Sequence, residues 1–198
     1  RRKSSVPPTK EEERAPGKAD LEERPEFTVF VQTKQQFEMV LGKFKMYRKL
    51  SERSYGIYLA AESFDAQEWK KLADRCHEVG VRCYLMMPRI FRKEAEQYFR
   101  KQMELLTSAG FDALGIGSME EPGFLREAGI ELPMYFDQGM YSWNHLAGAA
   151  MERYGADRLT IPVELNEREI RDSGVQGEMI VYGYLPMMIS AQCIRKTT

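Results

Sequence analysis

The feature that most constrains the fold of this chain is a repeated unit, in which a short apolar run leads into a helix-capping residue and an amphipathic segment. In three of these units a Thr, Asp or Asn follows the run, and a Gln or Glu stands three positions later. The pairs are Thr33 with Gln36, Asp65 with Glu68, and Asn166 with Glu169. Two side chains at this spacing form a capping box, in which each accepts a free backbone amide at a helix start. The repeat therefore predicts strands that alternate with helices.

Glycines mark the other ends of the predicted helices. A glycine follows each of four helical patterns and precedes the next apolar run: Gly80, Gly110, Gly129 and Gly155. Glycine adopts the left-handed backbone conformation that ends a helix at little steric cost. Between caps and glycines, apolar residues recur at intervals of three and four, which is typical of a helix with one buried face. We therefore expect each helix to end at its glycine.

The apolar runs predict parallel strands. They span residues 27–31, 57–60, 82–86, 113–116, 134–136, 158–163 and 179–182. Nearly continuous apolar strands are typical of parallel sheets that are covered on both faces. We predict an α/β fold that resembles a TIM barrel and has about seven parallel strands. Because a closed (β/α) barrel has about eight strands, this count fits an incomplete barrel. An open sheet is the alternative, and the lack of a GxGxxG or P-loop motif disfavours it.

Composition divides the chain into two parts. Residues 1–25 are polar, charged and proline-containing, so we predict a disordered linker there. Residues 26–198 form the predicted barrel-like domain. The chain opens with Arg1-Arg2-Lys3 and no apolar leader, which indicates a piece of a longer protein.

Charge and cysteine content exclude several classes of protein. The net charge is −1, which gives no overall attraction to nucleic acid or to anionic lipid. No apolar run approaches the length of about 18 residues that spans a membrane. The three cysteines contain no CxxC pair, so we expect a cytoplasmic protein without a disulfide framework.

Polar residues follow most of the predicted strands. In (β/α) barrels the active site lies at the carboxyl ends of the strands, so these residues are the candidates for a site. They are Gln32, Glu62, Arg89, Ser118, Glu120, Asp137, Gln138, Glu164, Tyr182, Gly183 and Tyr184. We expect them to face one mouth that suits a small polar or anionic ligand.

Each of the charged candidates has a second interpretation. Asp137 and Glu164 are candidates for an acid/base pair, and Arg89 for a group that binds a carboxylate. Alternatively, Glu62 and Glu164 only stabilise the starts of the helices that follow them, and Arg89 pairs with a nearby carboxylate of the protein. Nothing in the spacing decides between these interpretations.

A single thiol stands near the end of the chain. Residues 178–195 read as an apolar strand, a turn at Gly183, a break at Pro186 and then Cys193. Cys193 is either a small core residue or a residue of a site on the loop. Cys76 and Cys83 lie in a helical face and a strand, so we expect them to be inert.

Several short motifs occur in a characteristic order in the second half of the chain. They are Gly115-Ile116-Gly117, Leu132-Pro133-Met134, Asn144, Gly155-Ala156-Asp157-Arg158, LTIPVELN at 159–166, and VYGYLPMMIS at 181–190 followed by Cys193. Their order and spacing resemble the collagenase-like peptidase U32 family. The match is to the second, C-terminal barrel-like segment of its long members, with residues 1–25 as the linker between domains.

The resemblance implies a hydrolase that acts on peptide bonds, a class of protease with no agreed catalytic residues. Its catalytic candidates here are Glu164, Asp137 and Arg89. The residues expected to bind a peptide or small polar substrate are Glu62, Asn144, Tyr182 and Gly183. We expect no cofactor in this fragment and no activity from it alone, because other domains of the same long chain are its partners.

Other branches of the family imply a first alternative. Those branches hold a [4Fe–4S] cluster on four cysteines and are implicated in the hydroxylation of RNA bases. Cys193 corresponds to one of these cysteines, so it is a candidate iron–sulfur ligand in the full-length protein. One thiolate cannot hold such a cluster, which normally needs four. The second alternative is a non-catalytic half-barrel that binds a partner.

Overall fold

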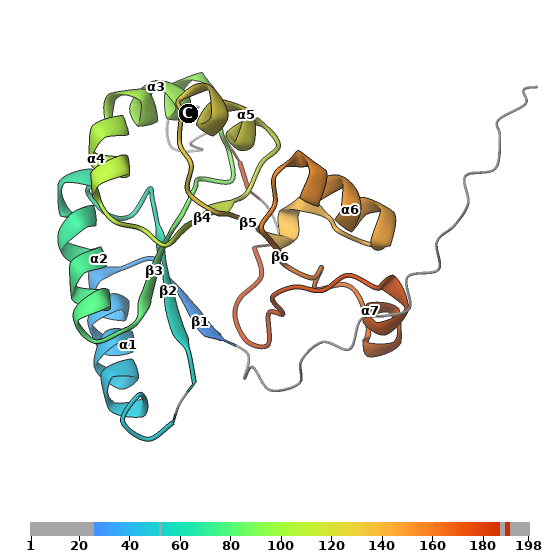
Figure 1. Cartoon of the computed structure of the whole chain (residues 1–198), viewed down its shortest axis with the longest axis horizontal. Coiled ribbons are helices and arrows are strands. Elements are labelled where there is room, and N and C mark those ends of the chain that lie inside the picture. Colours follow the sequence, from blue (N-terminus) through green and yellow to red (C-terminus); the bar gives the residue numbers. More distant parts are fainter. Residues whose placement is uncertain (1–25, 52, 187–188, 191–198) are drawn as a thin grey trace, which may run out of the picture.

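The computed structural model describes residues 26–51, 53–186 and 189–190. Six parallel strands form one sheet in the order of the sequence. They are β1 (Phe27–Val31), β2 (Tyr55–Ala60), β3 (Arg82–Met86), β4 (Ala113–Ile116), β5 (Met134–Phe136) and β6 (Arg158–Leu159). The sheet curls into a half-barrel (Figure 1), which confirms the predicted α/β, barrel-like fold. The predicted linker at 1–25 lies outside the described residues.

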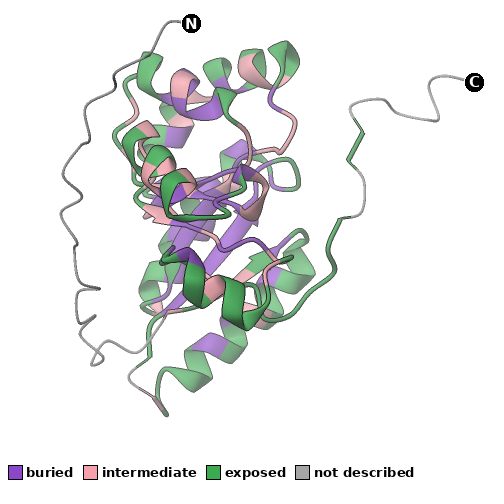
Figure 2. Ribbon diagram, turned by 90° about the vertical axis from the view of Figure 1, so that its right-hand side faces the viewer, coloured by how far each residue is buried: buried purple, intermediate pink, exposed green. Residues whose placement is uncertain are grey.

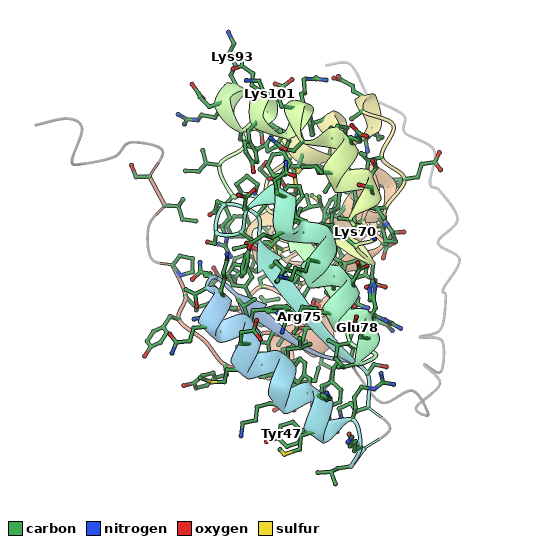
Figure 3. The ribbon with its side chains drawn as sticks, turned by 90° about the vertical axis from the view of Figure 1, so that its left-hand side faces the viewer. Tyr47, Lys70, Arg75, Glu78, Lys93 and Lys101 are labelled. Carbon is green, nitrogen blue, oxygen red and sulfur yellow. The ribbon has the colours of Figure 1, made fainter. Side chains whose placement is uncertain are left out.

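Helices cover the outer face of the sheet (Figure 1). They are α1 (Lys34–Tyr47), α2 (Trp69–Glu78), α3 (Lys93–Lys101), α4 (Met103–Ser108), α5 (Glu120–Glu127), α6 (His145–Tyr154) and α7 (Glu167–Ser173), with short 3₁₀ turns η1 (Ala66–Glu68) and η2 (Gln138–Met140). Helices α1 and α2 lie side by side (Figure 3), and Arg75 of α2 donates to Glu38 of α1 at 2.7 Å. None of the helices in the described residues is long and apolar enough to cross a bilayer.

The local signals at the helix ends are largely confirmed. Asn166 and Glu169 form the full capping box at the start of α7. Thr33 accepts from the Gln36 amide at 3.1 Å, while the Gln36 side chain accepts from the amide of Gln32 instead of Thr33. Asp65 accepts from the Gln67 amide at 3.0 Å, so it caps η1 and forms no box with Glu68. The four predicted glycines, Gly80, Gly110, Gly129 and Gly155, have φ of 68°, 79°, 71° and 115°.

The two faces of the sheet have different cores. Alternate residues such as Ile57 and Leu85 point toward the helices and are fully buried there. On the inner face, Tyr58, Tyr84 and Ala113 form a separate buried cluster. The rings of Tyr58 and Tyr84 lie 4.7 Å apart, centroid to centroid. The concave side of the half-barrel is therefore filled by aromatic residues.

Two carboxylates connect distant strands across this concave side. Glu26, which precedes β1, accepts from Arg158 of β6 at 2.8 Å and from the Tyr84 hydroxyl of β3 at 2.6 Å. Glu178 accepts from the Tyr58 hydroxyl at 2.9 Å and from the Thr28 hydroxyl. Because these bonds join β1 and β2 to β6 and the segment after α7, they hold the sheet in its curled shape.

The prediction of a seventh strand at 179–182 is wrong. Among the described residues, pairing beyond β6 consists of one bridge, between Thr160 and Glu178. Glu178 bonds to the Leu159 carbonyl and the Ile161 amide, and the described residues show no further pairing along this segment. The segment beyond Glu178 extends away from the sheet (Figure 2), and Tyr182 is 94% exposed.

Candidate functional site

An ion pair lies at the carboxyl edge of the sheet, where the sequence predicted a site. Arg89, in the loop after β3, approaches Asp137, directly after β5, with 2.7 Å between Nη2 and Oδ2. The Asp137 amide donates to the carbonyl of Ile116 in β4, which fixes its position. Asp137 is 8% exposed and the Arg89 side chain 33% exposed. The guanidinium therefore keeps donors available to solvent while its partner is buried.

The electrostatics of this edge centre on Arg89. Burial raises the pKa of Asp137, and the charge of Arg89 opposes the rise. Burial of its carboxyl group also raises the pKa of Glu62, which follows β2, although the residue as a whole is exposed. Arg89 again opposes the rise through its charge, although its ion pair is with Asp137. We call Glu62, Arg89 and Asp137 the rim cluster.

The backbone of the loop after β4 passes directly against Arg89. A Cβ added to Gly117 would lie 3.2 Å from Arg89 Cγ and 3.3 Å from its Cα. These distances are tighter than ordinary contacts, so a larger residue would push Arg89 away. Gly117 thus contributes to the site by having no side chain.

A buried carboxyl group holds this loop, and the sequence analysis missed it. Glu121, in the first turn of α5, is 0% exposed and accepts from the amides of Gly117 at 2.8 Å and Ser118 at 3.3 Å. Burial raises its pKa to about 8, with the amide hydrogen bonds opposing the rise. Glu121 shares the buried face of α5 with Phe124 and Leu125. That i, i+3, i+4 spacing was the signal that a carboxyl group would be buried there.

Other predicted site residues are not part of the rim cluster. Glu164, after β6, is exposed, and the charge that acts on Asp137 is that of Arg89, so the structure gives no support to an Asp137–Glu164 acid/base pair. Tyr182 and Gly183 lie in the exposed segment that leaves the sheet. Within the described residues the predicted strand at 179–182 does not form. Tyr182 and Gly183 are therefore not brought to the carboxyl edge of the sheet.

Asn144 is the N-cap of α6, and its Oδ1 accepts from the Ala147 amide at 3.0 Å. We expect Asn144→Ala to lower the free energy of unfolding by about 1 kcal/mol, because the amide loses its partner. Asn144→Asp retains an acceptor and is expected to cost less. Urea denaturation of both variants measures the difference. If both variants lose the same free energy of unfolding, the capping hydrogen bond is not the source of the stability that Asn144 contributes.

The described residues do not fit an iron–sulfur cluster. Among them, no three His, Cys, Asp or Glu side chains converge as metal ligands would. Cys76 and Cys83 are free and buried, between α2 and β3 on the outer side of the sheet. Cys193, the candidate ligand, lies outside the described residues.

Comparisons with solved structures concern the fold alone. A protein assigned as a fructose-1,6-biphosphate aldolase from Coccidioides immitis is 12% identical, with a TM-score of 0.54, and the match covers 73% of this chain and 58% of that one. Thiamine phosphate pyrophosphorylase from Pyrococcus furiosus is 11% identical, with a TM-score of 0.46, and the match covers 78% of this chain and 84% of that one. Muconate cycloisomerase from Pseudomonas fluorescens is 8% identical, with a TM-score of 0.46, and the match covers 67% of this chain and 37% of that one. The chain thus spans less than two thirds of the aldolase and of the cycloisomerase.

The comparison with protein families is more specific. No curated protein matches the chain. The sequence model of peptidase family U32, in contrast, matches residues 47–197. This match includes β2 to β6, the rim cluster and the motifs from Gly115 to Ser190. It confirms the resemblance seen in the sequence, and the chain belongs to peptidase family U32.

Proposed function

We propose that this chain is a domain of a hydrolase that cleaves peptide bonds, and that the rim cluster binds and polarises the substrate. The observation that carries the proposal is the Arg89–Asp137 pair at the carboxyl edge of the sheet. Membership of a peptidase family supports the reaction class. The other domains of a longer chain are the expected partners in activity.

Arg89 suits a substrate carbonyl or carboxylate. A guanidinium has five N–H donors, and Asp137 occupies only one side of it. Peptide hydrolysis develops negative charge on the carbonyl oxygen, which a fixed cation at a partly buried site stabilises. In this role Asp137 is a positioning residue, because it orients Arg89 and is itself almost inaccessible.

Glu62 is the candidate general base. A base that activates water works best when its pKa lies close to the working pH. Partial burial raises the pKa of Glu62 in that direction, and the exposed part of the residue leaves room for a water molecule. Glu62 accepts a proton from water as the water oxygen forms a bond to the carbonyl carbon next to Arg89. The C–N bond of the resulting tetrahedral intermediate then breaks, and Glu62 returns the proton to the leaving amine.

Arg89→Gln tests this assignment in the full-length protein, with gelatin and a fluorogenic peptide as substrates. We expect kcat/KM to fall about 100-fold or more, by analogy with the loss of an oxyanion-stabilising donor. Arg92→Gln is the matched control, since Arg92 is exposed three residues away in the same loop. The proposal fails if the wild-type protein cleaves neither substrate, or if both variants lose activity equally.

The iron–sulfur-dependent modification of RNA remains the alternative from the family resemblance. It depends on Cys193 and on cysteines beyond this chain, and the described residues add nothing in its favour. Iron and sulfide analysis of the full-length protein, purified without oxygen, distinguishes the two. A stoichiometric cluster that is lost in Cys193→Ser would replace the hydrolase proposal. A half-barrel that only binds a partner predicts neither a cluster nor cleavage.

A further inference from the structure

A cavity of about 780 Å³ lies at the amino ends of the strands. The connection between α1 and β2, the turn after α2 and the start of β3 form its walls. Its polar lining comes from Arg48, Lys49, Ser51, Arg53, Ser54 and Arg82. In parallel strands the amino ends lie opposite the carboxyl ends, so this cavity is separate from the rim cluster. The connection after α1 lies at the bottom of Figure 1, and α3 at the top.

The cavity is positively charged. Four of its lining residues are Lys or Arg, and none of its described lining residues is acidic. No carboxylate of the described residues lies within 4.0 Å of a charged nitrogen of Arg48, Lys49 or Arg53. Glu52, outside the described residues, is the one acidic residue between Lys43 and Ser54 in the sequence. The wall therefore carries an excess of cations.

The fourth cation, Arg82, has only a distant and shared counter-ion. Its Nη1 lies 3.7 Å from Glu26, whereas Arg158 lies 2.8 Å from the same carboxylate. The Tyr84 hydroxyl also donates to Glu26 at 2.6 Å. Glu26 is thus shared between Arg82 and the interior of the half-barrel, so the Arg82 charge that lines the cavity is only partly compensated.

Arg48 is held in place without a carboxylate. Its Nη1 donates to the carbonyls of Val79, at 3.0 Å, and Gly80, at the end of α2. A Cβ added to Gly80 would lie 2.5 Å from Arg48 Cζ, so only glycine admits the guanidinium there. A cation that is fixed by neutral carbonyls keeps its charge and its remaining donors for a ligand.

A purely structural explanation covers only part of this arrangement. Cations after the last turn of a helix are favoured by the helix dipole, which explains Arg48 and Lys49 after α1. It does not explain Arg53 or Arg82, which belong to the connection and to β3. The charged wall also excludes an apolar ligand, since a cation transferred to an apolar surface loses its hydration.

We propose that this cavity binds a phosphate-bearing ligand. Fixed guanidinium groups pair with phosphate oxygens through two parallel hydrogen bonds, and lysine and serine side chains add further donors. The volume falls within the range of about 300–1,000 Å³ that is typical of small-molecule sites. The site lies at the other end of the sheet from the proposed hydrolytic residues, so it does not depend on that function.

Inorganic pyrophosphate is the probe, and isothermal titration calorimetry on the full chain at low ionic strength is the measurement. We expect saturable binding at one site, weakened about tenfold or more by Arg53→Ser, in line with the loss of a hydrogen bond to a charged group. Arg53 is exposed, so the substitution leaves the core intact. Lys101→Ser, on the exposed end of α3 (Figure 3), is the matched control and is expected to leave binding unchanged.

A parallel titration with ADP identifies the source of the phosphate. Tighter binding of ADP than of pyrophosphate, lost in Arg53→Ser, supports a nucleotide, and equal binding supports a ligand recognised by phosphate alone. Absence of pyrophosphate and ADP binding overturns the proposal. Equal weakening by Arg53→Ser and Lys101→Ser overturns it as well, because that result indicates attraction by the overall charge. Activity on peptides plays no part in this readout, so the two proposals fail independently.

Discussion

Glu121→Gln is expected to change how the stability of the protein depends on pH. Burial raises the pKa of Glu121 from an ordinary 4.5 to about 8. The folded protein therefore keeps a proton that the unfolded chain releases above pH 4.5. The stability that this proton contributes is fully present below pH 4.5 and is lost as pH rises to about 8, by about 1.4 kcal/mol per pH unit at most.

Glutamine has nearly the shape of the protonated acid and does not ionise. The free energy of unfolding of Glu121→Gln, relative to wild type, should therefore rise steadily between pH 5 and pH 8. Urea denaturation at four pH values within this range measures the difference. Glu131→Gln, at an exposed position after α5, is the control and should give a difference that hardly changes with pH. Parallel curves for Glu121→Gln and wild type would show that Glu121 ionises in the folded protein.

Glu26→Gln is expected to lower the free energy of unfolding by about 3 kcal/mol. Removing one partner of a buried ion pair leaves the other charge uncompensated, which costs about 3–5 kcal/mol. The lower end applies here, because the side chain of Glu26 is 9% exposed but that of Arg158 is 26% exposed. The Tyr84 hydroxyl also loses its charged acceptor.

An exposed pair provides the comparison for this experiment. Lys34 and Glu68 lie 2.7 Å apart with side chains that are 66% and 36% exposed. Glu68→Gln should cost less than about 1 kcal/mol, as is usual for surface pairs. Chemical denaturation of both variants at pH 7 gives the two values. If Glu26→Gln costs no more than Glu68→Gln, the carboxylate of Glu26 does not hold the half-barrel together.

Much of the fold was predictable because its signals are local. A helix cap and a glycine with positive φ depend on a few neighbouring residues, so Asn166 and Gly155 could be interpreted directly from the sequence. The seventh strand was not predictable in this way. The apolar run at 179–182 has the composition of a strand, but a strand also needs a partner strand to pair with, and β6 spans only Arg158–Leu159.

The site was predictable residue by residue but not as a set. Parallel strands place Arg89 and Asp137 at the same edge, whereas the loop after β3 and the position of Gly117 decide that they touch. Nothing in the sequence pairs Glu26 with Arg158, since 132 positions separate them. Glu121 was missed because the candidates were chosen as residues that follow the strands, and Glu121 lies inside α5.

The contacts of Glu178 also bear on the order in which the chain assembles. Neighbouring strands follow one another in the sequence, so the sheet can grow one βα unit at a time. The bond between Thr28 and Glu178, in contrast, joins positions that are 150 residues apart. We therefore expect the first strands to collapse early and the ends of the sheet to join late. During synthesis on the ribosome, the concave side would stay unsealed until residue 178 has left the exit tunnel.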